Sequence, residues 1–156
     1  MKISQKIIDY AIWYYLKYYP SPKKLALKLE QKFWEKSEKW KKYWGITKEE
    51  IDFIIKEKLK NILQEEEVIK AKIKSYKNKG KSKKYIILKM FERLENMDLV
   101  RKNLDEIFWE DGELENLKKE LKKYNYSDDL NYEEKQKIFL KIIRKWYNWE
   151  DLKKVI

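Results

Sequence analysis

The chain of 156 residues has a formal net charge of +11 and contains neither cysteine nor histidine. Without cysteine there are no disulfides, thiolate metal sites or cysteine nucleophiles, and without histidine the commonest metal ligand and general base is missing. Only 3 Gly and 2 Pro accompany 43% hydrophobic and 42% charged residues, a mixture that favours amphipathic helices over β structure.

The chain begins with an amphipathic pattern that predicts a helix over residues 5–19. We expect this helix to stop before Pro20, because a residue that precedes proline disfavours helical angles. Ser21 then provides a cap and Pro22 a first helical position for a second helix, which runs to about Trp34.

Residues 31–44 are rich in tryptophan and lysine, have helical character and are closed by Gly45. Thr47 and Glu50 have the spacing of a capping box at the start of the next helix. That helix carries an apolar stripe of Ile51, Ile54, Ile55, Leu59 and Ile62.

The middle of the chain contains three further predicted helices. Glu65–Glu67 suit a helix start, where the macrodipole favours anions, and Gly80 ends that helix. Ser82 leads into a helix that reaches Glu95, and another carries the apolar residues between Leu99 and Ile107.

The last third continues in the same way. Leu114, Leu117 and Leu121 have helical spacing, a polar loop covers residues 125–131, and Ile138, Phe139 and Ile142 belong to the penultimate helix. Asn148 caps the last helix. The predicted fold class is all-α, with about nine or ten short helices.

A cap residue followed by aliphatic residues four and eight positions later occurs three times, and residues at this spacing lie on one stripe of a helix. The copies are Ser21, Leu25 and Leu29, then Ser82, Ile86 and Met90, then Asn148, Leu152 and Ile156. They lie 61 and 66 residues apart, which indicates stacked helical units that share a core.

The positive charge is concentrated in the first two thirds of the chain. Residues 1–60 carry +7 and residues 61–104 carry +6, whereas residues 105–156 carry −2. From Lys70 to Lys89 there are nine lysines and no acid, which favours a nucleic acid or an acidic protein as the partner, since solubilising faces usually mix signs. A solvated pair of helices is the alternative.

Several segments follow one another in a distinctive order. Asn61–Glu65 is followed by the helical segment Val68–Ser75, the basic end Lys79–Gly80 and the helix of Ser82–Met90. Nearer the C-terminus, the lysine-rich helix that begins at Lys135–Ile138 leads into the segment Arg144–Leu152. This order resembles the RecX family of bacterial recombinase regulators over essentially the full chain.

The resemblance implies three tandem three-helix units at residues 1–63, 64–108 and 109–156, which form an elongated, curved array, with 31–44 as an extension of the first unit. The chain departs from the family at three positions. Leu94 and Trp146 stand where the family has glycine, and Gln64 stands where it has aspartate.

The resemblance also implies a function. Such regulators dock on the filament that RecA forms on single-stranded DNA and modulate, most often by inhibiting, homologous recombination and the SOS response to DNA damage. We expect stoichiometric binding by a basic face and no cofactor or small-molecule substrate. The residues predicted for this face are Lys74, Lys79, Lys81, Lys83, Lys84, Arg144 and Lys145.

The aromatic residues have two interpretations. Trp34, Trp40 and Trp44, interleaved with lysines, are candidates for stacking on bases or for anchoring a protein partner, with packing beneath an extra helix as the alternative. The other tryptophans lie near aliphatic stripes and are predicted to be in the core: Trp13, Trp109, Trp146 and Trp149.

No arrangement of carboxylates or glycines indicates catalysis or a metal site, so we expect a protein that is not an enzyme. A general nucleic-acid-binding protein and a helical protein–protein adaptor are the alternatives to the recombinase regulator. No apolar run approaches ~20 residues and the N-terminus lacks an apolar signal core, so we expect a cytoplasmic protein.

Overall fold

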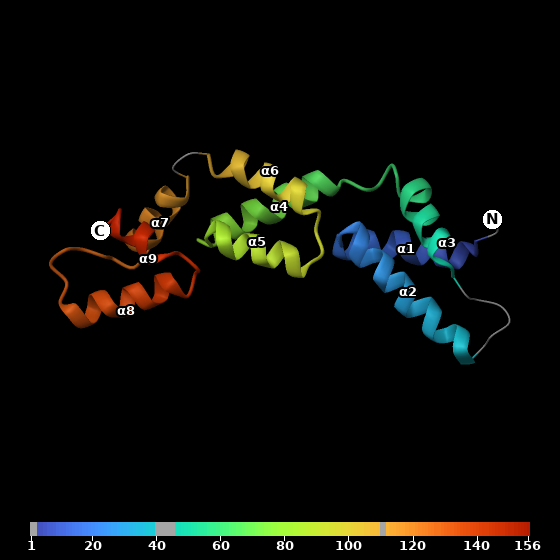
Figure 1. Cartoon of the computed structure of the whole chain (residues 1–156), viewed down its shortest axis with the longest axis horizontal. Helices are drawn as coiled ribbons and strands as arrows, with labels where there is room; N and C mark the ends of the chain where they lie inside the picture. Colours follow the sequence, from blue (N-terminus) through green and yellow to red (C-terminus); the bar gives the residue numbers. More distant parts are fainter. Residues whose placement is uncertain (1–2, 40–45, 110–111) are drawn as a thin grey trace. The chain divides into compact units, whose positions relative to one another are not determined.

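The computed structural model describes residues 3–39, 46–109 and 112–156, with side-chain positions for all of these except 34–39. Every regular element within these ranges is helical, so the all-α prediction is confirmed (Figure 1). The helices are α1 (Gln5–Tyr18), α2 (Pro22–Lys39), α3 (Lys48–Phe53), α4 (Glu65–Asn78), α5 (Lys83–Glu92), α6 (Met97–Ile107), α7 (Gly112–Lys123), α8 (Tyr132–Ile143) and α9 (Trp149–Lys153), and a π-helical turn at Ile54–Lys58 follows α3 directly.

The chain divides into two compact units. The first comprises residues 1–68 together with Arg93–Glu95, and the second comprises Ile69–Glu92 and Asn96–Ile156. The buried side chains form three clusters, one in the first unit and two in the second. The expected arrangement of three tandem repeats stays a prediction.

The core of the first unit lies where α1 packs on α2 and α2 packs on α3. Its most deeply buried residues include Ala11, Tyr15, Leu25 and Leu29, at the inward positions of their helices. The Tyr15 hydroxyl accepts a hydrogen bond from the backbone N–H of Gln64 at 3.1 Å, so this buried phenol also fixes the chain that leads into α4.

The second unit contains two apolar clusters. One gathers Ile69 and Ile73 of α4 with residues of α5 and α6, and it is closed by Phe108. The other gathers Leu117 of α7 with residues of α8, and Leu152 of α9 joins it. Each cluster is built from three short helices that could not bury an apolar face alone.

Most predicted helix starts are confirmed. Thr47 and Glu50 form the expected capping box, and the side chain of Asn148 accepts a hydrogen bond from the N–H of Asp151 at 2.7 Å. Asn131 and Glu134 form a second capping box at the start of α8.

Helix ends differ more from the predictions. α1 ends at Tyr18 because Tyr19 adopts a left-handed conformation with a φ of 44°, and α2 runs to Lys39 rather than to Trp34. α5 ends at Glu92, three residues before the predicted Glu95, and Leu94 in the following turn is left-handed with a φ of 58°.

The three sequence copies do not occupy equivalent places. Ser21 and Ser82 are buried and accept hydrogen bonds from the N–H groups of Lys24 and Tyr85, both at 3.2 Å, as N-caps of α2 and α5. The third copy caps α9. Its last residue, Ile156, lies beyond the end of that helix and is exposed. Only the first two copies therefore begin with a buried serine that caps its helix.

The prediction that four tryptophans belong to the core is wrong. Trp109 is 78% exposed, and Trp13, Trp146 and Trp149 each keep more than two fifths of their surface accessible. The apolar positions next to them, such as Phe108 and Tyr147, are buried instead. Proximity to an aliphatic stripe did not fix which side of the helix or turn each indole takes.

Leu94 offers a test of the left-handed turn after α5. Leu94→Gly is expected to be about 1 kcal/mol more stable to urea unfolding than Leu94→Ala, since both variants lose the same side chain but only glycine adopts this φ without strain. At Leu27, an exposed residue inside α2, the same pair should rank in the opposite order. An alanine variant at position 94 that is at least as stable as the glycine variant would contradict the turn.

Candidate anion-binding surface

Two turns that are far apart in the sequence meet within the second unit. One is the turn between α4 and α5, at residues 79–82, and the other is the turn between α8 and α9, at residues 144–147. The N–H of Ser82 donates a hydrogen bond to the carbonyl of Lys145 at 3.3 Å, and the Ser82 hydroxyl donates one to the carbonyl of Trp146 at 2.8 Å. The two basic segments predicted from the sequence are therefore neighbours in space.

Gly80, in the first of these turns, packs closely against α7. Its φ is 70°, in the left-handed region that favours glycine, and it is buried. A Cβ atom at this position would clash with the carboxylate end of Glu120 on α7. The backbone of the turn therefore packs directly against the Glu120 side chain, which would have to shift to admit a larger residue.

Glu120 is buried, with 6% of its side chain accessible, and it forms an ion pair with Lys145. Burial by itself lowers the pKa of Lys145, but hydrogen bonds to Glu120 and to Tyr124 outweigh that effect and raise it. Lys123 contributes a second cation 3.7 Å from the Glu120 carboxylate. Lys145 thus serves to hold α7 and α8 together, and its charge is largely used inside the unit.

Tyr147 anchors the same turn from its other side. Its hydroxyl accepts a hydrogen bond from the side-chain amide of Asn116 at 2.9 Å, and both residues are buried. Burial raises the pKa of Tyr147, so the phenol stays neutral and keeps its proton. The turn between α8 and α9 is therefore fixed by contacts on both sides of Trp146.

The remaining predicted residues differ in exposure. Lys74, Lys79, Lys84 and Arg144 have exposed side chains. Lys81 is half-buried and places its Nζ atom 4.5 Å from the ring centroid of Tyr85, within the range of a cation–π contact.

Lys83 is more deeply engaged. Its backbone N–H donates to the carboxylate of Glu113 at 2.9 Å, and its Nζ atom lies 5.7 Å from the ring centroid of Phe108. Of the seven predicted residues, Lys74, Lys79, Lys84 and Arg144 are the most available to a partner. Lys81 contributes from the edge, whereas Lys83 and Lys145 have structural contacts.

The run of lysines from Lys70 to Lys89 does not form one uniform face. Lys77 donates a hydrogen bond to the carbonyl of Ile107 at 2.6 Å, and Lys89 pairs with Glu92 at 2.6 Å. Lys70 lies 3.8 Å from a carboxylate oxygen of Glu106. The absence of acidic residues from this run therefore overestimates the number of lysines whose ammonium groups are available to a ligand.

An aromatic contact accompanies the basic turn. The rings of Tyr85 and Trp146 meet edge to face with centroids 6.3 Å apart, and Tyr76 packs on the other side of Tyr85 at 5.8 Å. Because Trp146 is exposed and Lys81 covers Tyr85, the surface offers rings as well as cations.

The aromatic site predicted around Trp34, Trp40 and Trp44 lies outside the described residues, apart from the backbone of Trp34 in α2. Its neighbour Phe33 is described. The Phe33 ring packs edge to face on Tyr10 of α1, with centroids 5.6 Å apart.

Sequence reasoning missed one feature of this surface and one feature of the first unit. It did not find Glu120 as the partner of Lys145, since no spacing rule links residues 25 apart. It also overlooked a row of tyrosines on α1, at Tyr10, Tyr14 and Tyr18, although their spacing of four residues was visible in the sequence.

Within the described ranges, no group of three or more acidic residues is placed to hold a metal ion. No helix in the same ranges is both long enough and apolar enough to cross a membrane. Comparison with known proteins finds no matching family model, no matching curated protein and no matching solved structure.

Gly80→Ala is expected to lower the free energy of unfolding by about 1–3 kcal/mol, because the added Cβ atom strains the backbone and displaces the Glu120 carboxylate from Lys145. Gly112→Ala is the matched control, since a Cβ atom there meets nothing nearer than 3.6 Å and should change stability by less than about 0.5 kcal/mol. Urea unfolding followed by circular dichroism measures both. Equal effects would show that Gly80 is not closely packed.

Ser82→Ala should cost about 1–2 kcal/mol, because it removes the cap of α5 and leaves the Trp146 carbonyl without its donor. Ser75→Ala changes the same atoms at an exposed position inside α4 and should be neutral or slightly stabilising. Comparing the urea midpoints of the two variants tests the junction at Ser82, where its hydroxyl contacts the Trp146 carbonyl. An unchanged midpoint for Ser82→Ala would rule out this junction as a stabilising contact.

Proposed function

We propose that this protein is a non-enzymatic regulator of homologous recombination that binds the RecA–single-stranded DNA filament and restrains its activity. The observation that carries the proposal is the junction at Ser82, which joins the turn of Lys79 and Lys81 to the turn that begins at Arg144. Cations gathered from distant segments suit a polyanionic or acidic partner.

The resemblance to RecX supplies the identity of that partner. Two of the positions at which the chain departs from the family are relevant to this resemblance. Leu94 and Trp146 stand where the family has glycine, and both adopt left-handed angles, with φ values of 58° and 71°. A backbone that favours glycine at both places supports the alignment of the chain with the family.

The proposed mechanism is stoichiometric. Exposed lysines and Arg144 contact phosphates or acidic groups along the filament, while Lys145 and Glu120 keep the two turns in register. Because both turns are anchored to buried groups, the cations meet the partner at little further cost in ordering. We place this action in the cytoplasm, where the filament forms.

General binding of nucleic acid is the second candidate. It is favoured by the single sign of the exposed residues Lys74, Lys79 and Lys84, which would serve any polyphosphate equally well. This alternative predicts the same affinity for bare DNA and for the filament, with a steep loss of affinity as salt rises. An adaptor that binds protein through residues 31–44 predicts little affinity for either.

The first experiment measures binding of the full chain to preassembled RecA–single-stranded DNA filaments by fluorescence anisotropy at near-physiological salt. Bare single-stranded DNA and free RecA are titrated in parallel. Tighter binding to the filament than to either component supports the regulator. Equal affinity for bare DNA favours the second candidate and removes the first.

The triple variant Lys74→Glu, Lys79→Glu and Lys84→Glu is expected to weaken filament binding at least about tenfold and to lower the salt slope of log K by about 2. The control reverses three exposed lysines of α7, Lys118, Lys119 and Lys122, and therefore changes the net charge by the same amount. It should retain most of the affinity. If both variants lose affinity equally, net charge rather than this surface drives the binding.

A further inference from the structure

Helix α1 carries a row of aromatic side chains at the edge of its core face, where Tyr10 and Tyr14 are half-buried and pack against the core of the unit. Tyr10, Tyr14 and Tyr18 succeed one another every four residues, with ring centroids 5.9 and 4.8 Å apart. Trp13 joins them, with its ring 5.7 Å from that of Tyr10. The fully buried residues of the same helix are Ile7, Ile8, Ala11 and Tyr15.

A row of lysines on α2 faces these rings. Lys24, Lys28 and Lys32 also succeed one another every four residues, so they lie along one side of α2 and rise by about 6 Å from one to the next. The Nζ atom of Lys32 lies 3.5 Å from the ring centroid of Tyr10. On α1 itself, the Nζ atom of Lys17 lies 4.9 Å from the centroid of Trp13.

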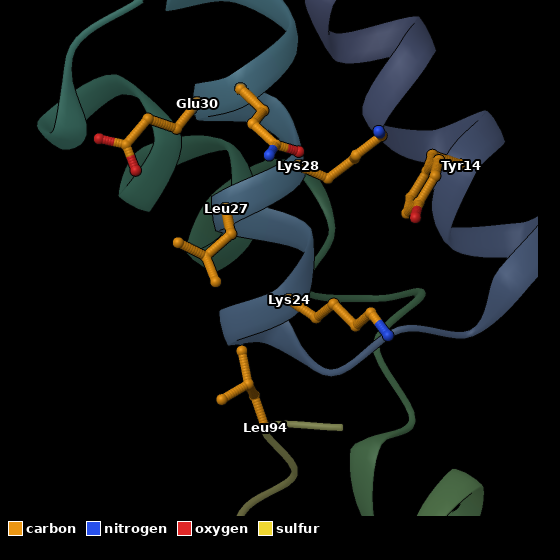
Figure 2. A pocket seen from close by; sticks show the side chains of 7 residues that line it. Tyr14, Lys24, Leu27, Lys28, Glu30 and Leu94 are labelled. Carbon is orange, nitrogen blue, oxygen red and sulfur yellow. The ribbon is translucent and has the colours of Figure 1, made fainter. Parts of the chain in front are cut away.

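A groove of about 620 Å³ separates part of the two rows, and its lining comprises Tyr14, Lys24, Leu27, Lys28, Glu30, Gln31 and Leu94. Figure 2 shows the ammonium ends of Lys24 and Lys28 reaching from α2 toward α1 and Tyr14, whereas the carboxylate of Glu30 extends away from them. One side of the groove thus offers the ring of Tyr14 and the other offers two cations, with the Glu30 carboxylate directed away from them.

We propose that this groove and the exposed rings of Trp13 and Tyr18, which flank Tyr14, bind an unpaired DNA strand, with bases stacked on those rings and phosphates held by the lysine row of α2. Single-strand binding surfaces combine these two features, because every base has a stacking face and every nucleotide a phosphate. The choice of DNA over RNA rests on the proposed function. The groove itself is independent of the Ser82 junction, since it lies entirely in the first unit.

The exposure of the rings supports this occupant over an apolar peptide. Trp13 is 49% exposed and Tyr18 is 53% exposed, so each has ring surface available for stacking. The sequence of residues 1–60 carries a net charge of +7, and Lys17, Lys24, Lys28 and Lys32 surround the rings without an acidic residue in either row. A purely apolar peptide would bury these ammonium groups without supplying an opposite charge or a hydrogen-bond acceptor, which is unfavourable.

The test titrates the full chain, without recombinase, into a fluorescent dT12 oligonucleotide and follows anisotropy. The double variant Trp13→Leu and Tyr18→Leu should weaken binding at least about tenfold, since stacking on one ring alone changes affinity by about fivefold or more. The control is Trp109→Leu and Tyr132→Leu, which removes one indole and one phenol that are 78% and 76% exposed in the second unit. It should change affinity less than about twofold.

A second arm tests the lysine row. Lys24→Gln with Lys28→Gln should reduce the slope of log K against log salt by about 1.4, the value for two phosphate contacts on a single strand. Lys118→Gln with Lys122→Gln removes the same charge from exposed positions of α7 and should leave the slope nearly unchanged.

Four results would overturn the proposal. The first is no binding of dT12, and the second is an equal loss of affinity in the aromatic variant and in its control. The third is an equal loss of that variant's affinity for dT12 and for a 12-base-pair duplex, and the fourth is tighter binding of rU12 than of dT12. Sedimentation velocity adds a fifth, because a dimer that Trp13→Leu and Tyr18→Leu convert to a monomer would identify a second copy as the occupant. All arms omit the filament, so their failure leaves the proposed function to its own test.

Discussion

The hydrogen bond from the Ser82 hydroxyl to the Trp146 carbonyl holds together two turns that are 64 residues apart. The same oxygen accepts the N–H of Tyr85, so one small side chain both starts a helix and joins it to a distant segment. Ser21 repeats this arrangement in the first unit, where it caps α2 and donates to the carbonyl of Arg93 at 3.2 Å. Serine is suited to both tasks because it is small enough to be buried and can donate and accept at once.

Local rules determined most of the fold in advance. The capping box at Thr47 and Glu50, the acidic start of α4 and the left-handed Gly80 depend on residues a few positions apart, and each appears where the spacing placed it. The ends of α1 and α5 were less predictable, because Tyr19 and Leu94 adopt left-handed angles that their residue types disfavour. No local pattern in the sequence predicts left-handed angles at these two residues.

The candidate surface was predictable only in part. Proximity in sequence and sign of charge identified the lysines around Gly80, but the fate of each depended on what lay opposite: a carbonyl for Lys77, a ring for Lys81 and a buried carboxylate for Lys145. A lysine that meets such a group inside the unit is no longer a free cation. The rings of α1 show the opposite case, since their spacing was plain in the sequence but only the exposed fraction of Trp13 marks them as a surface.

Leu94 and Trp146 follow the C-terminal ends of α5 and α8, and both are non-glycine residues in a left-handed conformation. Each departs from its preferred backbone at a cost of about 1–2 kcal/mol, which a single change to glycine would remove. Neither side chain is buried, so gains in core packing are small at both positions. A change to glycine would therefore relax the backbone but remove a side chain from a surface: Leu94 lines the groove beside α2, and the indole ring of Trp146 packs on Tyr85 beside the basic turn.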